Sequence, residues 1–446
     1  MNTTGAEPAD RTAEGAVTRL VADYVVPADG DGTVIAGGAV DIDGAGRIVA
    51  VDPESALPAG PVVERLGGLL MPGLVNAHAH TPMTLVRSAG DGLPLQRWLT
   101  EGVWPLEGRM TPDDARCGML AGSVEMLLAG VTTSCEMYLY EDALIDAVNE
   151  TGARMVMTPG VIAALAPGGD VEPRIAEIGD CYRRHHDPDG RITVGFGPHS
   201  IYDLSPSQVK AISAQAREVG ALLHIHLEET QQERADVMAA HGRSATRLLA
   251  DQGVLEGPVL AAHGVWLDAE DQALLAEAGA SVAHCPQSNL KLGSGIAPLV
   301  DLLTAGVGVG LGTDGPASND DLDLWEELRL APLLARGVAI DPGAMGAVTA
   351  LDLATRQAAN AVGLSDVGEL RVGAQADVIR LDLDHPSFTP LVADRLLTQL
   401  VFAGSARHVT DVWVAGHRVV REGAITTVDA AEVRRETQER ADRIAG

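Results

Sequence analysis

The stretch MPGLVNAHAHTP, residues 71–82, is an apolar run that ends in two histidines placed two positions apart. Residues i and i+2 of a β-strand point to the same side, so His78 and His80 project together. Neutral imidazole nitrogens on one side of a strand suit a zinc or iron(II) ion. The alternative is a pair of histidines that are only hydrogen-bonded at a strand end, and the HxH spacing alone leaves both readings open.

Seven further apolar, β-branched runs follow, separated by helical stretches rich in Ala, Leu and Glu. In order, the runs are GVTTSCEMY, RMVMTPGV, ITVGFGPHS, LLHIHLEE, VLAAHGV, ASVAHCP and GVGVGLGTD. Eight strand–helix units predict a (β/α)8 TIM barrel, an α/β fold, over residues 71–365. A doubly wound open sheet is the competing architecture, but no GxGxxG motif follows the first strand.

The two ends of the chain have a different texture, with short strands that are broken by turn signals such as Gly-Asp-Gly. Residues 16–70 and 366–446 are therefore predicted to form one small β-sandwich domain built from both chain ends. The last segment, VDAAEVRRETQERADRIAG, is predicted to be a polar helix on or near that domain. Residues 1–15 are polar and acidic and are predicted to be disordered.

Composition excludes several classes of partner. The chain has 62 acidic and 32 basic residues and a formal charge of −30, which disfavours nucleic acids and anionic membranes. No apolar run reaches the length of a membrane span, and the first residues lack the features of a signal peptide. The four cysteines are scattered without a CxxC pair. These features predict a soluble, cytoplasmic protein with neither a nucleic-acid nor a membrane partner.

Ionisable residues gather where the apolar runs end. In a barrel, the C-terminal ends of the strands meet at one mouth, where active sites are built. In HIHLEE, His226 lies on the same face as His224 and precedes Glu229 by three positions. Three histidines and one aspartate from the first, fifth and eighth runs predict a mononuclear metal site, with His224 behind it. The residues at these run ends are His78, His80, His199, His226, Glu229, His263, His284 and Asp314.

The stretches PGLVNAHAHTPM, HIHLEET, AAHGV, HCPQSNLKLGSG and GLGTDGPASNDDLD together resemble the amidohydrolase superfamily. The resemblance is to its mononuclear zinc deaminases, in the group of 5-methylthioadenosine/S-adenosylhomocysteine deaminases and related chlorohydrolases. It implies one zinc ion per subunit, with iron(II) as the alternative. It further implies that Glu229 is the general acid/base, that His263 polarises or positions the attacked centre, and that Asp314 accepts a proton. The metal ligands that it implies are His78, His80, His226 and Asp314.

The scarcity of lysine separates this chain from other branches of the superfamily. Binuclear members use a carboxylated lysine at the end of the fourth strand to bridge two metals. Here the fourth run ends in GPHS with His199, and the only lysines are Lys210 and Lys291, which lie elsewhere. A single metal ion is therefore expected, which argues against hydrolysis of cyclic amides.

The segment DGLPLQRWLTEGVWPLEGRM, after the first run, is long enough to arch over the barrel mouth. It resembles the lid of the thioadenosine deaminases, which implies that Glu107 binds the two ribose hydroxyls; a carboxylate suits two vicinal hydroxyls. Trp98 and Trp104 are expected to contact substrate or, equally, only to anchor the lid. Glu136 stands where the family more often has aspartate, and we expect it to alter packing or the pocket edge. The resemblance places three more residues near substrate: His199 at the ribose or purine, Ser318 near the base, and Arg174 at the homocysteine carboxylate.

These observations predict a metal-dependent aminohydrolase that converts an adenosine-like nucleoside to the inosine analogue and ammonia. The candidate substrates are 5-methylthioadenosine, S-adenosylhomocysteine, 5′-deoxyadenosine, adenosine and aminodeoxyfutalosine. One alternative is deamination or dechlorination of a free heteroaromatic ring of the guanine, pterin or s-triazine type. Another is a barrel that binds a ligand without catalysis. The resemblance also implies a homo-oligomer, either a dimer or a tetramer.

Overall fold

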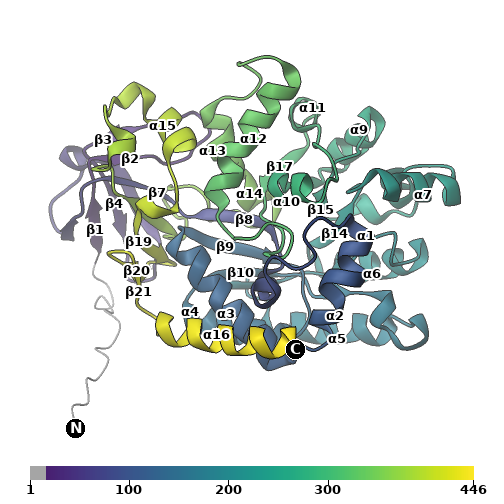
Figure 1. Ribbon diagram of the computed structural model, residues 1–446. Coiled ribbons are helices and arrows are strands. Elements are labelled where there is room, and N and C mark those ends of the chain that lie inside the picture. Colours follow the sequence, from purple (N-terminus) through teal and green to yellow (C-terminus); the bar gives the residue numbers. More distant parts are fainter. Residues whose placement is uncertain (1–16) are drawn as a thin grey trace, which may run out of the picture.

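The structure is a computed structural model in which residues 17–446 are described (Figure 1). The prediction of disorder for residues 1–15 falls outside these residues. Within residues 17–446, no helix is both long enough and apolar enough to cross a membrane.

The middle of the chain builds two four-stranded sheets in which all neighbouring strands are parallel. The first has the order β12-β10-β9-β8 and the second the order β14-β15-β16-β17. Each of the eight apolar runs contributes one of these strands. Their bounds are β8 Leu74–Ala79, β9 Val131–Glu136, β10 Arg154–Met157, β12 Ile192–Val194, β14 Leu223–Leu227, β15 Val259–His263, β16 Ser281–His284 and β17 Gly308–Leu311.

Isolated parallel bridges connect the two sheets at both edges. Phe196, just beyond β12, bridges to Leu223 of β14, and Ala79 of β8 bridges to Asp314 beyond β17. A short sheet of β11 (Gly160–Val161) and β13 (Gly197–Pro198) continues the strands of the first sheet. The second bridge brings the end of the first run beside the end of the eighth, although about 235 residues separate them in sequence.

Helices follow the parallel strands and pack their apolar sides on the sheets. Several begin with a polar cap that satisfies their free backbone N–H groups: Thr111 with Asp114 at α3, Ser205 with Gln208 at α6, and Asp268 at α9. The helices of this region are α3 Pro112–Leu128, α4 Glu141–Thr151, α5 Glu172–His185, α6 Pro206–Val219, α7 Gln231–His241, α8 Ala245–Asp251, α9 Ala269–Ala278, α10 Pro286–Lys291, α11 Leu299–Ala305, α12 Leu324–Ala339, α13 Ala347–Leu353 and α14 Arg356–Ala361.

The two ends of the chain share a sheet. In the order β21-β20-β19-β18-β7-β2-β3, β7 from the first part pairs antiparallel with β18 from the last part, and a second sheet has the order β5-β4-β1-β6. Figure 1 shows these N-terminal and C-terminal strands side by side, away from the middle sheets. Their bounds are β1 Thr18–Val21, β2 Tyr24–Val25, β3 Ile35–Ala36, β4 Gly38–Ile42, β5 Ile48–Pro53, β6 Val62–Arg65, β7 Leu69–Pro72, β18 Val378–Leu381, β19 Val409–Val414, β20 His417–Arg421 and β21 Ala424–Ile425.

The predicted C-terminal helix is α16, Ala430–Ala445, and α15, Leu396–Ala403, precedes it. Instead of covering the terminal sheets, α16 lies along α3 (Figure 1). Arg440 donates to the buried carboxylate of Asp114 on α3 over 2.8 Å. Arg109, near the end of the lid segment, donates to the carbonyl oxygen of Ile444 over 2.8 Å. The helix therefore contacts the end of the lid segment.

The lid folds as a series of short helical turns after β8. It comprises η2 (Thr81–Val86), α1 (Leu95–Arg97), the π-helical turn η3 (Trp98–Val103) and α2 (Trp104–Glu107). The Trp98 indole N–H donates to the carbonyl of Ala89 over 2.9 Å and so ties the two arms of the segment together. Glu107 is the last residue of α2.

Candidate metal centre and substrate cavity

Four side chains from three strand ends converge on one point. His78 lies on β8, His80 directly follows β8, His226 lies on β14, and Asp314 follows β17. Asp314 Oδ1 lies 3.4 Å from His78 Nε2 and 3.3 Å from His80 Nε2. Nε2 of His80 and Nε2 of His226 are 3.3 Å apart.

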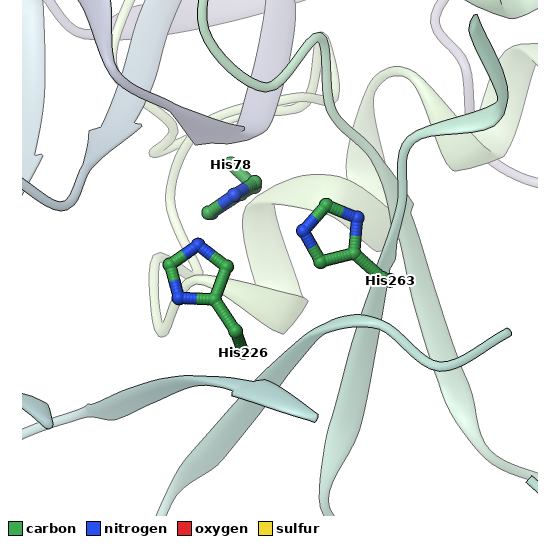
Figure 2. Close-up of side chains that lie close together, drawn as sticks. All are labelled: His78, His226 and His263. Carbon is green, nitrogen blue, oxygen red and sulfur yellow. The ribbon is translucent and has the colours of Figure 1, made fainter. Parts of the chain in front are cut away.

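His263, at the end of β15, lies close to His78 and His226. Donor atoms of His78, His226 and His263 lie within 4.8 Å of one another, and so do those of His78, His80 and Asp314. Figure 2 shows the rings of His78, His226 and His263 turned toward a common point. His263 Nδ1 is bonded to Asn289 Oδ1 over 2.9 Å, and its Nε2 faces Glu229 Oε2 at 3.9 Å. We therefore assign His80 rather than His263 to the set that also includes Asp314.

The hydrogen bonds behind the histidines fix which nitrogen faces the centre. His80 Nδ1 donates to the carbonyl of Met137 over 2.6 Å, and His226 Nδ1 donates to the carbonyl of His199 over 2.8 Å. In the neutral ring the proton then sits on Nδ1, so the two Nε2 lone pairs face each other. Two lone pairs so close repel unless a cation lies between them. Their 3.3 Å separation matches the ligand spacing of a tetrahedral zinc site with bonds of about 2.0–2.1 Å.

His78 supplies a second indication of a metal. Its ring is fully buried, and among residues 17–446 its Nε2 has no hydrogen-bond partner, although a buried polar atom normally has one. Its Nδ1 lies 2.9 Å from Nε2 of His224, whose own Nδ1 lies 2.9 Å from the hydroxyl of Thr158. His224 thus stands behind His78, where the sequence placed it. Burial lowers the pKa of His78 to about 4 and keeps the ring in its neutral, metal-binding form.

Asp314 is held in place by hydroxyl groups. Ser288 and Ser318 both donate to its Oδ2, over 2.5 and 2.9 Å, which leaves Oδ1 toward the histidines. Burial favours the neutral acid, but the neighbouring histidines outweigh it and hold the pKa of Asp314 well below its usual value. Three imidazole nitrogens and one ionised carboxylate form a donor set that fits a single zinc ion. Ser288 was missed at the sequence level, although the HCPQSN motif that contains it was noted.

The Ser318 hydroxyl contacts the carboxylate of Asp314, because the DGPAS turn folds it back onto that group. Ser318 is buried and is not among the described residues that line the cavity. Its place near a substrate base stays a prediction.

Glu229 lines the cavity beside this donor set and is 2% exposed. Burial, together with the negative charge of Asp314, raises its pKa well above the usual value for a carboxyl group. A raised pKa favours the protonated carboxyl group, the form that can donate a proton.

The buried carboxylate of Glu233 holds the backbone that presents Glu229. Its two oxygens accept the N–H groups of Glu228, over 3.2 Å, and Glu229, over 2.7 Å. Glu228 has a φ of +51°, a left-handed conformation that costs free energy in a residue other than glycine. Sequence reasoning missed Glu233. Its signal was a glutamate four residues after Glu229, in the first turn of α7.

A cavity of about 370 Å³ opens above the donor set. His80, His199, His226, Glu229, His263 and Asp314 lie at its floor, and the lid contributes Leu95, Trp98, Leu99, Trp104 and Glu107. The remaining wall includes Met137, Tyr138, Leu139, Tyr140, Ile162, Ala164, Leu165 and Tyr202. The lid segment therefore faces the metal centre across the cavity.

The predicted substrate contacts Glu107, His199 and Trp98 all line this cavity. The Tyr138 hydroxyl donates to Glu107 Oε1, and burial raises the pKa of Glu107. Burial also lowers the pKa of His199 to about 3, so its ring is neutral. Trp98 lines the cavity and also anchors the lid through Ala89, so the two readings of this residue are compatible.

Arg174 is not brought to the cavity. Its guanidinium forms a two-pronged pair with Glu141, over 2.9 and 3.0 Å, and also bonds to Glu177 and to the carbonyl of Gly160. It is not among the described residues that line the cavity. In this structure α5 places Arg174 behind the cavity wall, where acidic neighbours bind it, and its contact with a substrate carboxylate stays a prediction.

Glu136, the residue that departs from the family pattern, is fully buried beside the centre. It accepts the backbone N–H of Thr81 over 2.9 Å and also the Thr81 hydroxyl. It thereby fixes the residue that follows His80.

Residues 69–419 match the family model described as the amidohydrolase family. A 5-methylthioadenosine/S-adenosylhomocysteine deaminase from Pelotomaculum thermopropionicum is 39% identical, with 94% of this chain and 97% of the relative covered. The crystal structure of an adenosine deaminase from Xanthomonas campestris with bound zinc superposes with a TM-score of 0.92 at 35% identity, covering 97% of this chain and all of that one. A zinc complex of atrazine chlorohydrolase from Arthrobacter aurescens superposes with a TM-score of 0.87 at 24% identity, covering 95% of this chain and all of that one, which shows a common fold.

Proposed function

Because the chain belongs to the amidohydrolase family, we propose that it is a metal-dependent aminohydrolase that converts an adenosine-like nucleoside to the inosine analogue and ammonia. One observation carries this proposal: a zinc-type donor set and the buried carboxyl group of Glu229, whose pKa is raised, line the same cavity. The similarity to the thioadenosine and adenosine deaminases supports it.

The fold proposed with this function is one (β/α)8 barrel over residues 71–365 and one β-sandwich domain from residues 16–70 and 366–446. The parallel bridges at both edges of the middle sheets support the barrel. The pairing of β7 with β18 supports a domain built from both chain ends.

We assign one zinc ion per subunit to His78, His80, His226 and Asp314. A zinc ion held by these residues would supply Lewis acidity, which activates water as a nucleophile near neutral pH. Asp314, ionised beside the histidines, accepts the proton that the attacking water loses. Glu229 donates a proton to the ring nitrogen next to the attacked carbon and regains one from the added hydroxyl, while the proton on Asp314 passes to the amine, which leaves as ammonia. His263, oriented by Asn289, presents Nε2 beside Glu229 to charge that develops at the attacked centre.

Glu107 is proposed to bind the ribose. Its carboxyl group faces the cavity from the lid, and Tyr138 orients one of its oxygens. A carboxylate can accept hydrogen bonds from two vicinal hydroxyls, whereas a free heteroaromatic ring offers none. The lid thereby distinguishes a nucleoside from a guanine, pterin or triazine.

The test of this proposal is a panel of adenine nucleosides and free heterocycles, with turnover followed by the ultraviolet change on deamination and by ammonia release. Glu107→Gln should raise KM for a nucleoside by roughly 10- to 100-fold, since a charge-assisted hydrogen bond is lost, and should leave KM for a free base almost unchanged. Glu101→Gln, an exposed change in the same lid, is the control. If zinc-loaded protein turns over no adenine nucleoside, the proposed function is wrong.

We further propose that the enzyme is a cytoplasmic homo-oligomer without a nucleic-acid partner. The formal charge of −30 supports the last point, because a phosphate backbone needs a basic surface. Size measurement in solution tests for the dimer or tetramer.

A further inference from the structure

The position of the base at the floor leaves one part of a nucleoside unaccounted for, namely its 5′-substituent. The exposed residues of the cavity wall mark its opening, and Leu165 is 64% exposed there. Leu139, Ile162 and Ala164 line the wall beside it. With the base placed at the metal centre and the ribose at Glu107, as proposed above, this apolar wall is the part of the cavity that remains for the 5′-substituent.

The wall offers no positive charge to a substituent. None of the described residues that line the cavity is Lys or Arg, whereas Glu107, Glu229 and Asp314 are acidic. Lys291 is paired with Asp320, and Lys210 is an exposed residue of α6. A carboxylate that entered the cavity would lose water without gaining a cationic partner.

The guanidinium behind the wall is not free to supply that partner. Arg174 Nη1 and Nη2 both bond to Glu141, and its Nε bonds to the carbonyl of Gly160, which lines the cavity. Only 9% of Glu141 is exposed, so a swing of Arg174 into the cavity would leave a nearly buried carboxylate unpaired. Breaking a buried pair in this way is strongly unfavourable.

We infer that the enzyme selects nucleosides whose 5′-substituent is short, apolar and uncharged, such as a methylthio group, and disfavours those whose 5′-substituent carries a carboxylate, such as homocysteine. This inference rests on the proposed deaminase function. A methylthio group gains from burial against Leu139, Ile162 and Leu165, since each buried CH₂-sized group contributes about 0.8 kcal/mol or roughly fourfold in affinity. The amino-acid end of a homocysteine tail gains nothing comparable on this wall.

The experiment compares kcat/KM for 5-methylthioadenosine, S-adenosylhomocysteine and 5′-butylthioadenosine on the zinc-loaded enzyme. The butylthio compound has about the length of homocysteine without its charges, so it separates charge from size. We expect 5-methylthioadenosine to exceed S-adenosylhomocysteine by about tenfold or more, because an unpaired carboxylate forfeits at least one charge-assisted bond. The butylthio compound should lie close to the methylthio compound. Equal or better turnover of S-adenosylhomocysteine overturns the inference.

Two variants test the cause through the ratio of kcat/KM for S-adenosylhomocysteine to kcat/KM for 5-methylthioadenosine. This ratio does not change when part of the protein is unfolded. Leu165→Arg places a cation at the opening and should raise the ratio of S-adenosylhomocysteine to 5-methylthioadenosine by about three- to fivefold, as for an exposed ion pair. Leu165→Gln is the uncharged control and should not raise it. A ratio that is no higher in the arginine variant than in the glutamine variant contradicts the missing-cation explanation.

Arg174→Gln is the third variant. In this variant, the ratio of kcat/KM for S-adenosylhomocysteine to kcat/KM for 5-methylthioadenosine should equal that of the unaltered enzyme, because Arg174 remains paired with Glu141 during turnover. A fall in the ratio would show that Arg174 does reach the carboxylate, and would overturn the inference. If instead no adenine nucleoside is deaminated by any of these proteins, the proposed function itself fails.

Discussion

At the scale of single residues, the proposed chemistry depends on the raised pKa of Glu229. Its carboxyl group is buried in the cavity wall near Asp314 and His263, and both burial and the nearby negative charge raise its pKa. Replacement by glutamine keeps the shape and removes the transferable proton. Glu229→Gln should therefore lower kcat by about 100- to 10,000-fold with little change in KM, measured by steady-state deamination.

Metal content separates this loss from damage to the centre. Glu229→Gln should bind as much zinc as the unaltered protein, because Glu229 is not in the donor set. Glu277→Gln, an exposed change on α9, is the control for the substitution itself. A Glu229→Gln protein that keeps most of its activity would remove Glu229 from the proton transfer.

Residue positions were predictable where a motif carries them and not where packing decides them. His78, His80, His226 and Asp314 stand at strand ends that the hydrophobic pattern already marks, and the structure brings them together. Arg174 and Ser318 are different, because the contacts of each depend on how a loop or helix turns after its strand. No local pattern shows that Arg174 meets Glu141, a residue 33 positions earlier on another helix.

At the scale of elements, α16 is held to α3 by charge. Asp114 lies at the start of α3 and bonds to Arg440 and Arg443 of α16. Burial opposes its ionisation, but the hydrogen bonds from Arg443, Thr111 and Arg440 lower its pKa well below the usual value. A carboxyl group with a lowered pKa stabilises the fold fully above its unfolded pKa of about 4, and this contribution is lost as the pH falls below that value.

Asp114→Asn should therefore lower the free energy of unfolding at pH 7 by about 1–3 kcal/mol, as expected for charge-assisted hydrogen bonds. The difference between the two proteins should narrow as the pH falls below about 4, because the unfolded chain then takes up a proton on Asp114 that the native state does not bind. Thermal unfolding midpoints at a series of pH values measure this. Asp113→Asn, the exposed neighbour on the same turn, is the control and should show no such pH-dependent difference. A gap between Asp114→Asn and the unaltered protein that stays constant with pH would contradict the ion-pair explanation.

The elements themselves were largely foreseeable, since each of the eight apolar runs contains one parallel strand. Hydrophobic periodicity is a local property, and these strands are short, buried and β-branched, which makes them easy to recognise. The packing of α16 on α3 was not predictable from the sequence in the same way. Its many charged residues indicate only a solvent-exposed helix, and its docking on α3 depends on one buried aspartate 326 positions away.

At the scale of the whole molecule, the donor set joins the two middle sheets, because β8 belongs to the first sheet and β14 and β17 belong to the second. A metal ion that binds the folded but not the unfolded chain adds a stabilisation of about 2.7 kcal/mol at a free concentration 100 times Kd. Removal of the metal by a chelator should lower the thermal unfolding midpoint, and zinc should restore it. Elemental analysis should find one metal ion per subunit and identify it as zinc or iron. A ratio of two ions per subunit would contradict the mononuclear site.

The pairing of β7 with β18 has a consequence for protein synthesis. Leu69 of β7 lies opposite Leu381 of β18, so roughly 300 residues must emerge from the ribosome between them. β8, which carries His78, begins only a few residues after β7. The position beside β7 in the sheet is therefore filled late in synthesis, because translation proceeds at about 5–20 residues per second. Chains that stop before β18 would leave one edge of β7 unpaired, and a stop codon placed just before β18 should destroy activity even though every residue of the donor set has been translated.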